Sequence, residues 1–136
     1  LDTGRVVTIF LGQLLRGHPV TIIGDGSHTR GFTYVADAGE GTIKAKETEK
    51  GERENFNIGI NRETSMLELA KRMIQLSGSN SSVRFVSQRE VYGDSYEDIQ
   101  RRVPDIRKAE KILGFRATTE LDEGLKKTIT WFKENG

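Results

Sequence analysis

The chain has 136 residues and a net charge of +1, from 21 Lys or Arg against 20 Asp or Glu, with two His and no Cys. This length allows one domain with a real hydrophobic core, and the balanced charge argues against a nucleic-acid binder, which would carry a basic excess. The absence of Cys excludes disulfides and thiolate metal sites, and two isolated His at unrelated positions do not suggest a metal centre. No apolar run is long enough to span a membrane and no signal-peptide pattern opens the chain, so we expect a cytoplasmic protein without membrane partners.

The first half of the chain alternates between helical and strand-like patterns. Apolar residues at helical spacing open it, and Gly17 and Pro19 end that helix. Asp37 stands where the N-cap of a second helix is expected, because a carboxylate there accepts the first free backbone N–H groups. In chain order we predict helix 5–16, strand 21–23, strand 31–35, helix 37–46, a charged solvated loop at 47–54, and strand 55–59.

The second half contains the clearest helix of the sequence. Ser65 and Glu68 form a capping box, a broad apolar face follows, and Gly78 closes the helix. In chain order we predict helix 65–76, strand 83–86, an irregular segment at 87–104, a helix from Asp105 to residue 113, and a final amphipathic helix 121–132. Short strands mixed with several helices indicate a small α/β or α+β unit.

The stretch 20–37, VTIIGDGSHTRGFTYVAD, carries the first candidate for a binding site. Arg30 lies between the glycine turn and the second predicted strand. A guanidinium held by flanking strands can meet a phosphate with two parallel hydrogen bonds. Pairing of Arg30 with a surface carboxylate explains the pattern equally well, and both interpretations stay open on this stretch alone.

Other polar residues fall where ligands often bind. Asn57 lies inside a predicted apolar strand, so its amide either is satisfied within the core or contacts a ligand. Tyr92, Tyr96, Arg101 and Arg102 lie in the long irregular segment, which is either a binding loop or ordinary surface. An aromatic ring and an arginine in one loop suit a flat ring joined to a phosphate.

Several catalytic motifs are absent from the sequence. No Gly-x-Gly-x-x-Gly follows a strand, no Walker lysine motif or Gly-x-Ser-x-Gly elbow occurs, and none of the three tyrosines has a lysine four residues later. We therefore do not expect this chain alone to be a complete catalyst, and we expect neither a metal site nor a bound cofactor in it. The chain opens at Leu1, almost directly in an apolar helix, which suggests a piece of a longer protein.

Six stretches, in order and spacing, resemble the C-terminal, substrate-binding part of extended short-chain dehydrogenases/reductases that act on nucleotide sugars. They are GRVVTIF at 4–10, VTIIGDGSHTRGFTYVAD at 20–37, FNIG at 56–59, TSMLELA at 64–70, RRVPDIRKAEKILGF at 101–115 and LDEGLKKTITWF at 121–132. The segment YGDSYEDIQRRVPDI at 92–106 is most similar to the NAD-dependent UDP-glucuronic acid decarboxylases. One departure is His28, which stands where many relatives have glutamine.

The resemblance implies roles for individual residues. Arg30 falls on an arginine that binds the nucleotide end of the substrate, and Arg102 falls on one that contacts the diphosphate. Arg102 also matches a position linked to proton transfer, which makes it the catalytic candidate. The implied substrate-binding residues are Arg5, Thr21, Ile23, Arg30, Asn57, Tyr96 and Arg102, with Thr21 and Ile23 lining the base pocket and Asn57 and Tyr96 beside the nucleotide.

The resemblance also implies the remainder of the enzyme. A preceding Rossmann domain would bind NAD and carry a Tyr-x-x-x-Lys catalytic pair, and chemistry would begin with hydride transfer from the sugar to NAD. Residues 1–136 would then form the nucleotide-sugar-binding domain of an NAD-dependent decarboxylase, epimerase or dehydratase, with a UDP-sugar and the Rossmann domain as partners and a homodimer as the intact enzyme. The alternative is a stand-alone nucleotide-binding or protein-interaction module without catalysis.

Overall fold

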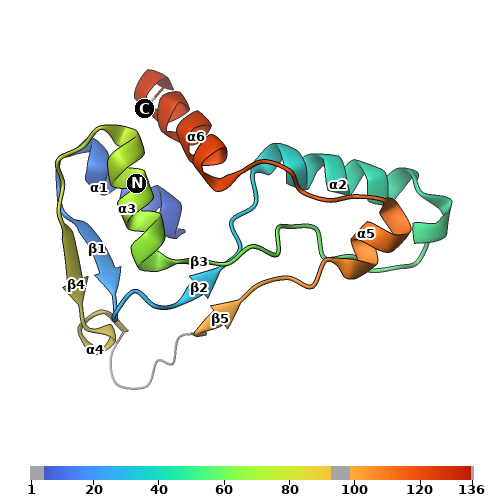
Figure 1. Cartoon of the computed structure of the whole chain (residues 1–136), viewed down its shortest axis with the longest axis horizontal. Coiled ribbons are helices and arrows are strands. Elements are labelled where there is room, and N and C mark those ends of the chain that lie inside the picture. The colour runs from blue at the N-terminus through green and yellow to red at the C-terminus, as the bar shows by residue number, and fades with distance from the viewer. Residues whose placement is uncertain (1–4, 93–98, 136) are drawn as a thin grey trace. The chain divides into compact units, whose positions relative to one another are not determined.

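The computed structural model describes residues 5–92 and 99–135, and they form a small mixed α/β fold of helices and short strands (Figure 1). The chain divides into two compact units and passes between them several times. The first unit comprises Leu1–His28, Ser65–Gln100 and Leu125–Gly136, and the second comprises Thr29–Thr64 and Arg101–Gly124.

The first unit is built around a parallel strand pair. Strand β1 (Val20–Ile23) pairs with β4 (Val83–Val86), in a register that joins Val20 to Val83 and Ile23 to Val86. Helices α1 (Val6–Leu15) and α3 (Met66–Ser77) pack on β1, and the short helix α4 (Gln88–Tyr92) follows β4. The buried hydrophobic side chains among the described residues of this unit are Phe10, Leu11, Leu14, Val20, Ile22, Leu69, Ala70, Met73, Leu125 and Ile129.

Helix α3 confirms the strongest helix prediction, with one difference at its start. The Ser65 hydroxyl accepts from the Glu68 N–H at 3.1 Å, and Gly78 ends the helix in the left-handed conformation at φ 70°. The Glu68 carboxylate instead accepts from the Arg72 guanidinium at 2.6 Å. Of the predicted capping box, the serine hydrogen bond is therefore present, whereas the glutamate forms an ion pair with the residue four positions later.

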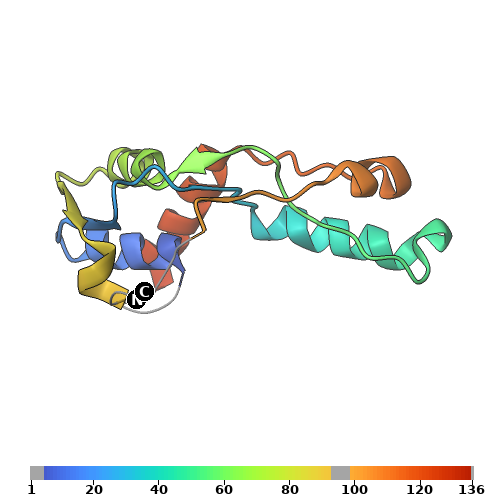
Figure 2. The same ribbon diagram turned by 90° about the horizontal axis from the view of Figure 1, so that it is seen from below.

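The second unit contains helices α2 (Val35–Glu47) and α5 (Arg107–Leu113), which lie side by side (Figures 1 and 2), and a short 3₁₀ helix η1 (Glu49–Gly51). Packing is close at Gly41, where an added Cβ would lie 2.5 Å from Ile58 Cγ2 and 2.8 Å from Phe115 Cε1. The core cluster of this unit consists of Ala109, Leu113, Phe115 and Ala117, with Ala45, Phe56, Ile58, Ile60 and Ile112 packed against it.

A second set of strands is made of two-residue elements, in the order β3–β2–β5. Strand β2 (Thr29–Arg30) is central, with β5 (Arg101–Arg102) paired parallel to it on one side and β3 (Thr64–Ser65) on the other. The final helix α6 (Leu121–Asn135) begins in the second unit and continues in the first. The predicted helices at 5–16, 65–76, 105–113 and 121–132 are thus confirmed, with ends shifted by a few residues.

Two predicted strands, 31–35 and 55–59, are wrong. Their chains lie close together, since an added Cβ at Gly31 would come within 2.6 Å of the Ile60 carbonyl oxygen. The Ile60 N–H, however, donates to the Thr33 hydroxyl at 3.0 Å. The Ile60 N–H is thus bonded to a side-chain oxygen and not to a backbone carbonyl oxygen, and no strand pairing forms between the two segments.

The predicted role of Asp37 as an N-cap is also wrong. The N-cap of α2 is Tyr34, which places Asp37 inside the first turn. Asp37 is buried, and its carboxylate accepts from the Thr119 N–H and the Thr119 hydroxyl, both at 3.0 Å. The carboxylate therefore ties α2 to the segment before α6. At α5 the side chain of Asp105 does accept a first-turn N–H, that of Arg107 at 3.1 Å, although the N-cap is Ile106.

Candidate functional site

The candidate site is built on the parallel pair β2–β5 of the second unit. The register joins Thr29 to Arg101 and Arg30 to Arg102. Because successive strand side chains point to opposite faces, Thr29 and Arg101 share one face and Arg30 and Arg102 share the other. The pair thus presents two chemically different faces, which we call the Thr29 face and the Arg30 face.

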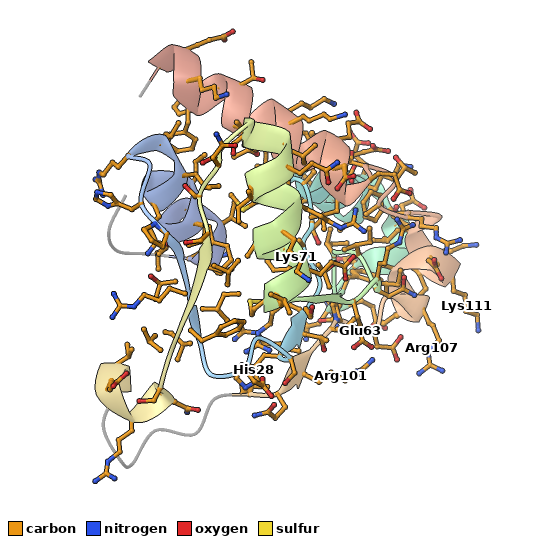
Figure 3. The ribbon with its side chains drawn as sticks, turned by 60° about the vertical axis from the view of Figure 1, so that its left-hand side comes forward. His28, Glu63, Lys71, Arg101, Arg107 and Lys111 are labelled. Atoms are coloured by element: carbon orange, nitrogen blue, oxygen red, sulfur yellow. The ribbon has the colours of Figure 1, made fainter. Side chains whose placement is uncertain are left out.

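The Thr29 face is neutralised within the chain. Glu63, the residue before β3, accepts from the Thr29 hydroxyl at 2.9 Å through Oε2, and from Arg101 Nε and Nη2 at 2.8 and 2.5 Å through Oε1. Glu63 and Arg101 are both labelled in Figure 3. The hydrogen bond from Arg101 holds the pKa of the Glu63 carboxyl below its usual value, and Glu63 raises the pKa of Arg101.

The Arg30 face carries two cations side by side. Arg30 is half-buried, and its Nη1 donates to the Thr29 carbonyl oxygen at 2.8 Å. Arg102 is exposed, and within residues 5–92 and 99–135 it forms no ion pair. An anion placed beside the two guanidinium groups would accept charge-assisted hydrogen bonds from both.

Asn57 does not lie in a strand, contrary to the prediction. It is exposed, and its Nδ2 donates to the Asp105 carbonyl oxygen at 3.2 Å. This bond ties the Asn57 segment to the chain three residues after Arg102. Arg30, Asn57 and Arg102 all belong to the second unit.

Two other cations of the second unit, Arg107 and Lys108, pair with carboxylates. Arg107 pairs with Asp105 at 2.5 Å, and this contact lowers the pKa of Asp105 to about 2. Lys108 pairs with Glu54 at 2.5 Å and lies over the Phe56 ring. These contacts distinguish Arg107 and Lys108 from Arg102, whose charge has no such partner among the described residues.

The remaining predicted site residues lie elsewhere. Arg5 precedes α1, and its carbonyl oxygen accepts from the Thr8 and Ile9 N–H groups. The Thr21 N–H of β1 donates to Gln13 Oε1 at 2.9 Å, and Ile23 ends that strand half-buried. These three residues belong to the first unit. Tyr96 lies outside the described residues.

His28 is buried at the end of the glycine turn in the first unit. Its carbonyl oxygen accepts from the Met66 N–H at 3.1 Å, and its ring lies 3.5 Å from the position that a Cβ on Gly24 would occupy. The backbone contact holds the start of α3 against the turn. The imidazole therefore packs as part of the fold at this position.

Sequence reasoning missed Glu63 and the pairing of β2 with β5. The signal was the doublet of Arg101 and Arg102, since two adjacent arginines in one strand must point to opposite faces. A strand of two residues is too short to show an alternating pattern, so β5 was not predicted and its residues were assigned to the irregular segment at 87–104.

Among residues 5–92 and 99–135, no group of three or more His, Asp or Glu side chains is arranged to hold a metal ion. None of the helices in that part of the chain is long and apolar enough to cross a membrane.

The sequence matches the family model described as GDP-mannose 4,6 dehydratase over residues 3–128. The chain therefore belongs to this family, within the NAD-dependent epimerases and dehydratases of the extended short-chain dehydrogenases/reductases. The fold and the family predicted from the sequence are both confirmed.

Individual relatives are similar over nearly the whole chain. A UDP-N-acetyl-alpha-D-glucosaminuronate decarboxylase of Bacillus cytotoxicus is 40% identical, over 95% of this chain and 40% of that protein's length. The UDP-glucuronic acid decarboxylase 1 of Xenopus tropicalis is 37% identical, over 98% of this chain and 30% of that protein. The chain thus spans less than half the length of these relatives.

Solved structures agree with the fold. The UDP-glucose 4-epimerase of Thermotoga maritima superposes with a TM-score of 0.85 at 32% identity, covering 96% of this chain and 40% of that one. The UDP-glucuronic acid 4-epimerase of Bacillus cereus, solved with UDP-glucuronic acid and NAD, gives a TM-score of 0.83 at 30% identity, covering 96% of this chain and 40% of that one.

Proposed function

We propose that this chain holds the nucleoside-diphosphate part of a UDP-hexuronate in an NAD-dependent decarboxylase, with UDP-glucuronate as substrate. The observation that carries the proposal is the register of β2 and β5, which sets Arg30 beside Arg102 on one face. The names of the decarboxylase relatives support the reaction, and both of those named above act on a nucleotide-linked uronate.

The chemistry of the Arg30 face suits a diphosphate. A diphosphate ester carries about two negative charges and offers several acceptor oxygens, and two guanidinium groups can meet them with charge-assisted, bidentate hydrogen bonds. Arg30 is anchored to the Thr29 carbonyl oxygen, so part of its side-chain entropy is already lost before a ligand binds. An arginine that is already held by a backbone hydrogen bond, next to an exposed arginine, can therefore bind an anion at a lower entropic cost.

The resemblance to the family supports roles for the other predicted residues. Thr21 and Ile23 line the pocket of the base, Asn57 and Tyr96 contact the nucleotide, and Arg5 makes a weaker contact. Arg102 also assists proton transfer. The intact enzyme is a cytoplasmic homodimer.

NAD is held outside this chain in our proposal. The Gly24-Asp25-Gly26 turn leads into β2 and not into a helix, so it does not fit the pyrophosphate of a dinucleotide. Titration of the 136-residue chain with millimolar NAD should therefore give no saturable heat. A micromolar dissociation constant would contradict this part of the proposal.

The experiment that tests the function is product analysis. The full-length protein that carries this chain is incubated with NAD and UDP-glucuronate, and in parallel with NAD and UDP-N-acetylglucosaminuronate. Release of CO₂ with formation of a UDP-pentose is expected from UDP-glucuronate. A UDP-hexuronate epimer without CO₂ would assign an epimerase, and an unchanged substrate in both reactions would contradict the proposal.

A further inference from the structure

The pairing of β2 with β5 has little backbone support. Each strand has two residues, and the hydrogen bond next to the pair, from the Gly31 N–H to the Arg102 carbonyl oxygen, is long at 3.4 Å. Strands of two residues are shorter than the usual range and supply few ladder hydrogen bonds. Other contacts must therefore fix the position of Arg102 relative to Arg30.

Glu63 supplies such a contact. It precedes β3, which lies on the far side of β2 from β5, so its side chain reaches across the central strand. One carboxylate oxygen accepts from Thr29 on β2 and the other accepts from Arg101 on β5. Glu63 thus joins the first residues of both strands.

We infer that Glu63 is a positioning residue for diphosphate binding, which sets Arg102 beside Arg30 by holding Thr29 and Arg101 in register. The inference rests on the proposed function. Thr29 and Arg101 each come one residue before an arginine of the Arg30 face. Fixing the first residue of each strand therefore fixes the direction in which the second one points, and preorganised contacts bind at lower entropic cost.

An ordinary surface ion pair is the competing explanation, and the chain offers a matched control for it. Arg62 and Glu120 also form an exposed ion pair in the second unit, but neither residue belongs to β2 or β5. Exposed pairs of this kind contribute little to stability. Loss of Glu120 should therefore leave both melting temperature and UDP affinity nearly unchanged.

Because Glu63 is negatively charged, a charge effect and a positioning effect predict opposite changes in UDP affinity when Glu63 is removed. On charge alone, removal of an anion near a diphosphate site would tighten binding. Positioning predicts the opposite, namely that Glu63→Ala weakens UDP binding by about threefold to tenfold. Glu63→Gln should weaken it less, because the amide oxygen still accepts one hydrogen bond.

The experiment measures UDP dissociation constants by calorimetry on the full-length protein, for Glu63→Ala, Glu63→Gln, Glu120→Ala, Arg102→Ala and the double variant Glu63→Ala/Arg102→Ala. Once Arg102 is absent, loss of Glu63 should have almost no further effect, since the two residues act through one contact. An additive loss in the double variant, or tighter binding by both Glu63 variants, would overturn the inference. If Arg102→Ala leaves the affinity unchanged, the proposed binding site itself fails.

Discussion

The two faces of the β2–β5 pair carry the same residue type in different surroundings. Arg101 on the Thr29 face meets a carboxylate of its own chain, whereas Arg102, the next residue, meets none among the described residues. We propose that the first cation completes the fold and that the second meets an external anion. Our proposal rests on this difference and not on charge composition, since the net charge of the chain is only +1.

The largest expected effect comes from removing either arginine of the Arg30 face. Arg30→Ala and Arg102→Ala should each lose a charged hydrogen bond worth roughly 1.5–3 kcal/mol, which is about tenfold to a hundredfold in affinity for a UDP-sugar. Melting temperatures should change little. Steady-state kinetics of the full-length protein provides the measurement, and Arg102→Ala should also lower kcat if Arg102 assists proton transfer.

Arg107→Ala is the control for that comparison. Arg107 is an exposed arginine of the same unit whose charge is taken by Asp105. Its loss should leave KM within about twofold, because it alters only an exposed ion pair. Equal effects of Arg102→Ala and Arg107→Ala would show that overall charge, and not the position of Arg102, governs binding.

Removal of the buried carboxylate of Asp37 should lower stability and leave ligand affinity unchanged, which is the reverse of the effect expected for the arginines of the Arg30 face. Asp37→Ala removes the buried acceptor of two hydrogen bonds from Thr119 and should lower the free energy of unfolding by about 1–3 kcal/mol. UDP affinity should stay the same at temperatures where the variant is folded. Chemical denaturation and calorimetry check the two halves of this prediction, and a loss of affinity without a loss of stability would contradict it.

A conservative change at the Arg30 face should have an intermediate effect. Arg30→Lys keeps the charge but replaces a planar fork by a point charge, so it should recover only part of the affinity that Arg30→Ala loses. A residual loss of about threefold to tenfold is expected. Full recovery would mean that Arg30 acts through charge alone and not through its geometry.

The smallest effect concerns pH and the Thr29 face. The pKa of Glu63 is lowered in the folded chain from an ordinary value of 4.5, so the folded state favours the charged form. The stabilisation is therefore present above about pH 4.5 and is lost as the pH falls through the lowered value. Thermal melts from pH 7 down to pH 3 should show a small advantage of the wild type over Glu63→Gln that disappears at the acid end, and an advantage that grows toward low pH would contradict the ion pair.

Much of the fold could be predicted from residue pattern alone. Helix α3 has a capping serine, an apolar face and a closing glycine, and the structure places its ends within a residue of the prediction. Strand β1 was recognisable as a β-branched run before the glycine turn. In these elements the local preference and the buried face agree, which is where single-sequence reasoning works best.

The elements that build the site were the ones that sequence reasoning missed. Strand β5 has two residues, and the contact that holds it comes from Glu63, 38 positions away along the chain. Residues 31–35 look like a strand, but the Thr33 hydroxyl takes the Ile60 N–H and Tyr34 caps α2. Short elements fixed by long-range side-chain contacts leave no periodic signal. The residue pattern named Arg30 and Arg102 as candidates with alternatives left open, and the resemblance to a family predicted their roles.

The most direct test of the central claim compares UDP with uridine. Calorimetric titrations of the full-length protein with each ligand measure what the diphosphate adds to binding, for the wild type and for Arg30→Ala/Arg102→Ala. We predict that UDP binds the wild type at least about a hundredfold more tightly than uridine, and that the double variant reduces this ratio to about tenfold or less. A ratio that is the same in both proteins would contradict the assignment of the diphosphate to the Arg30 face.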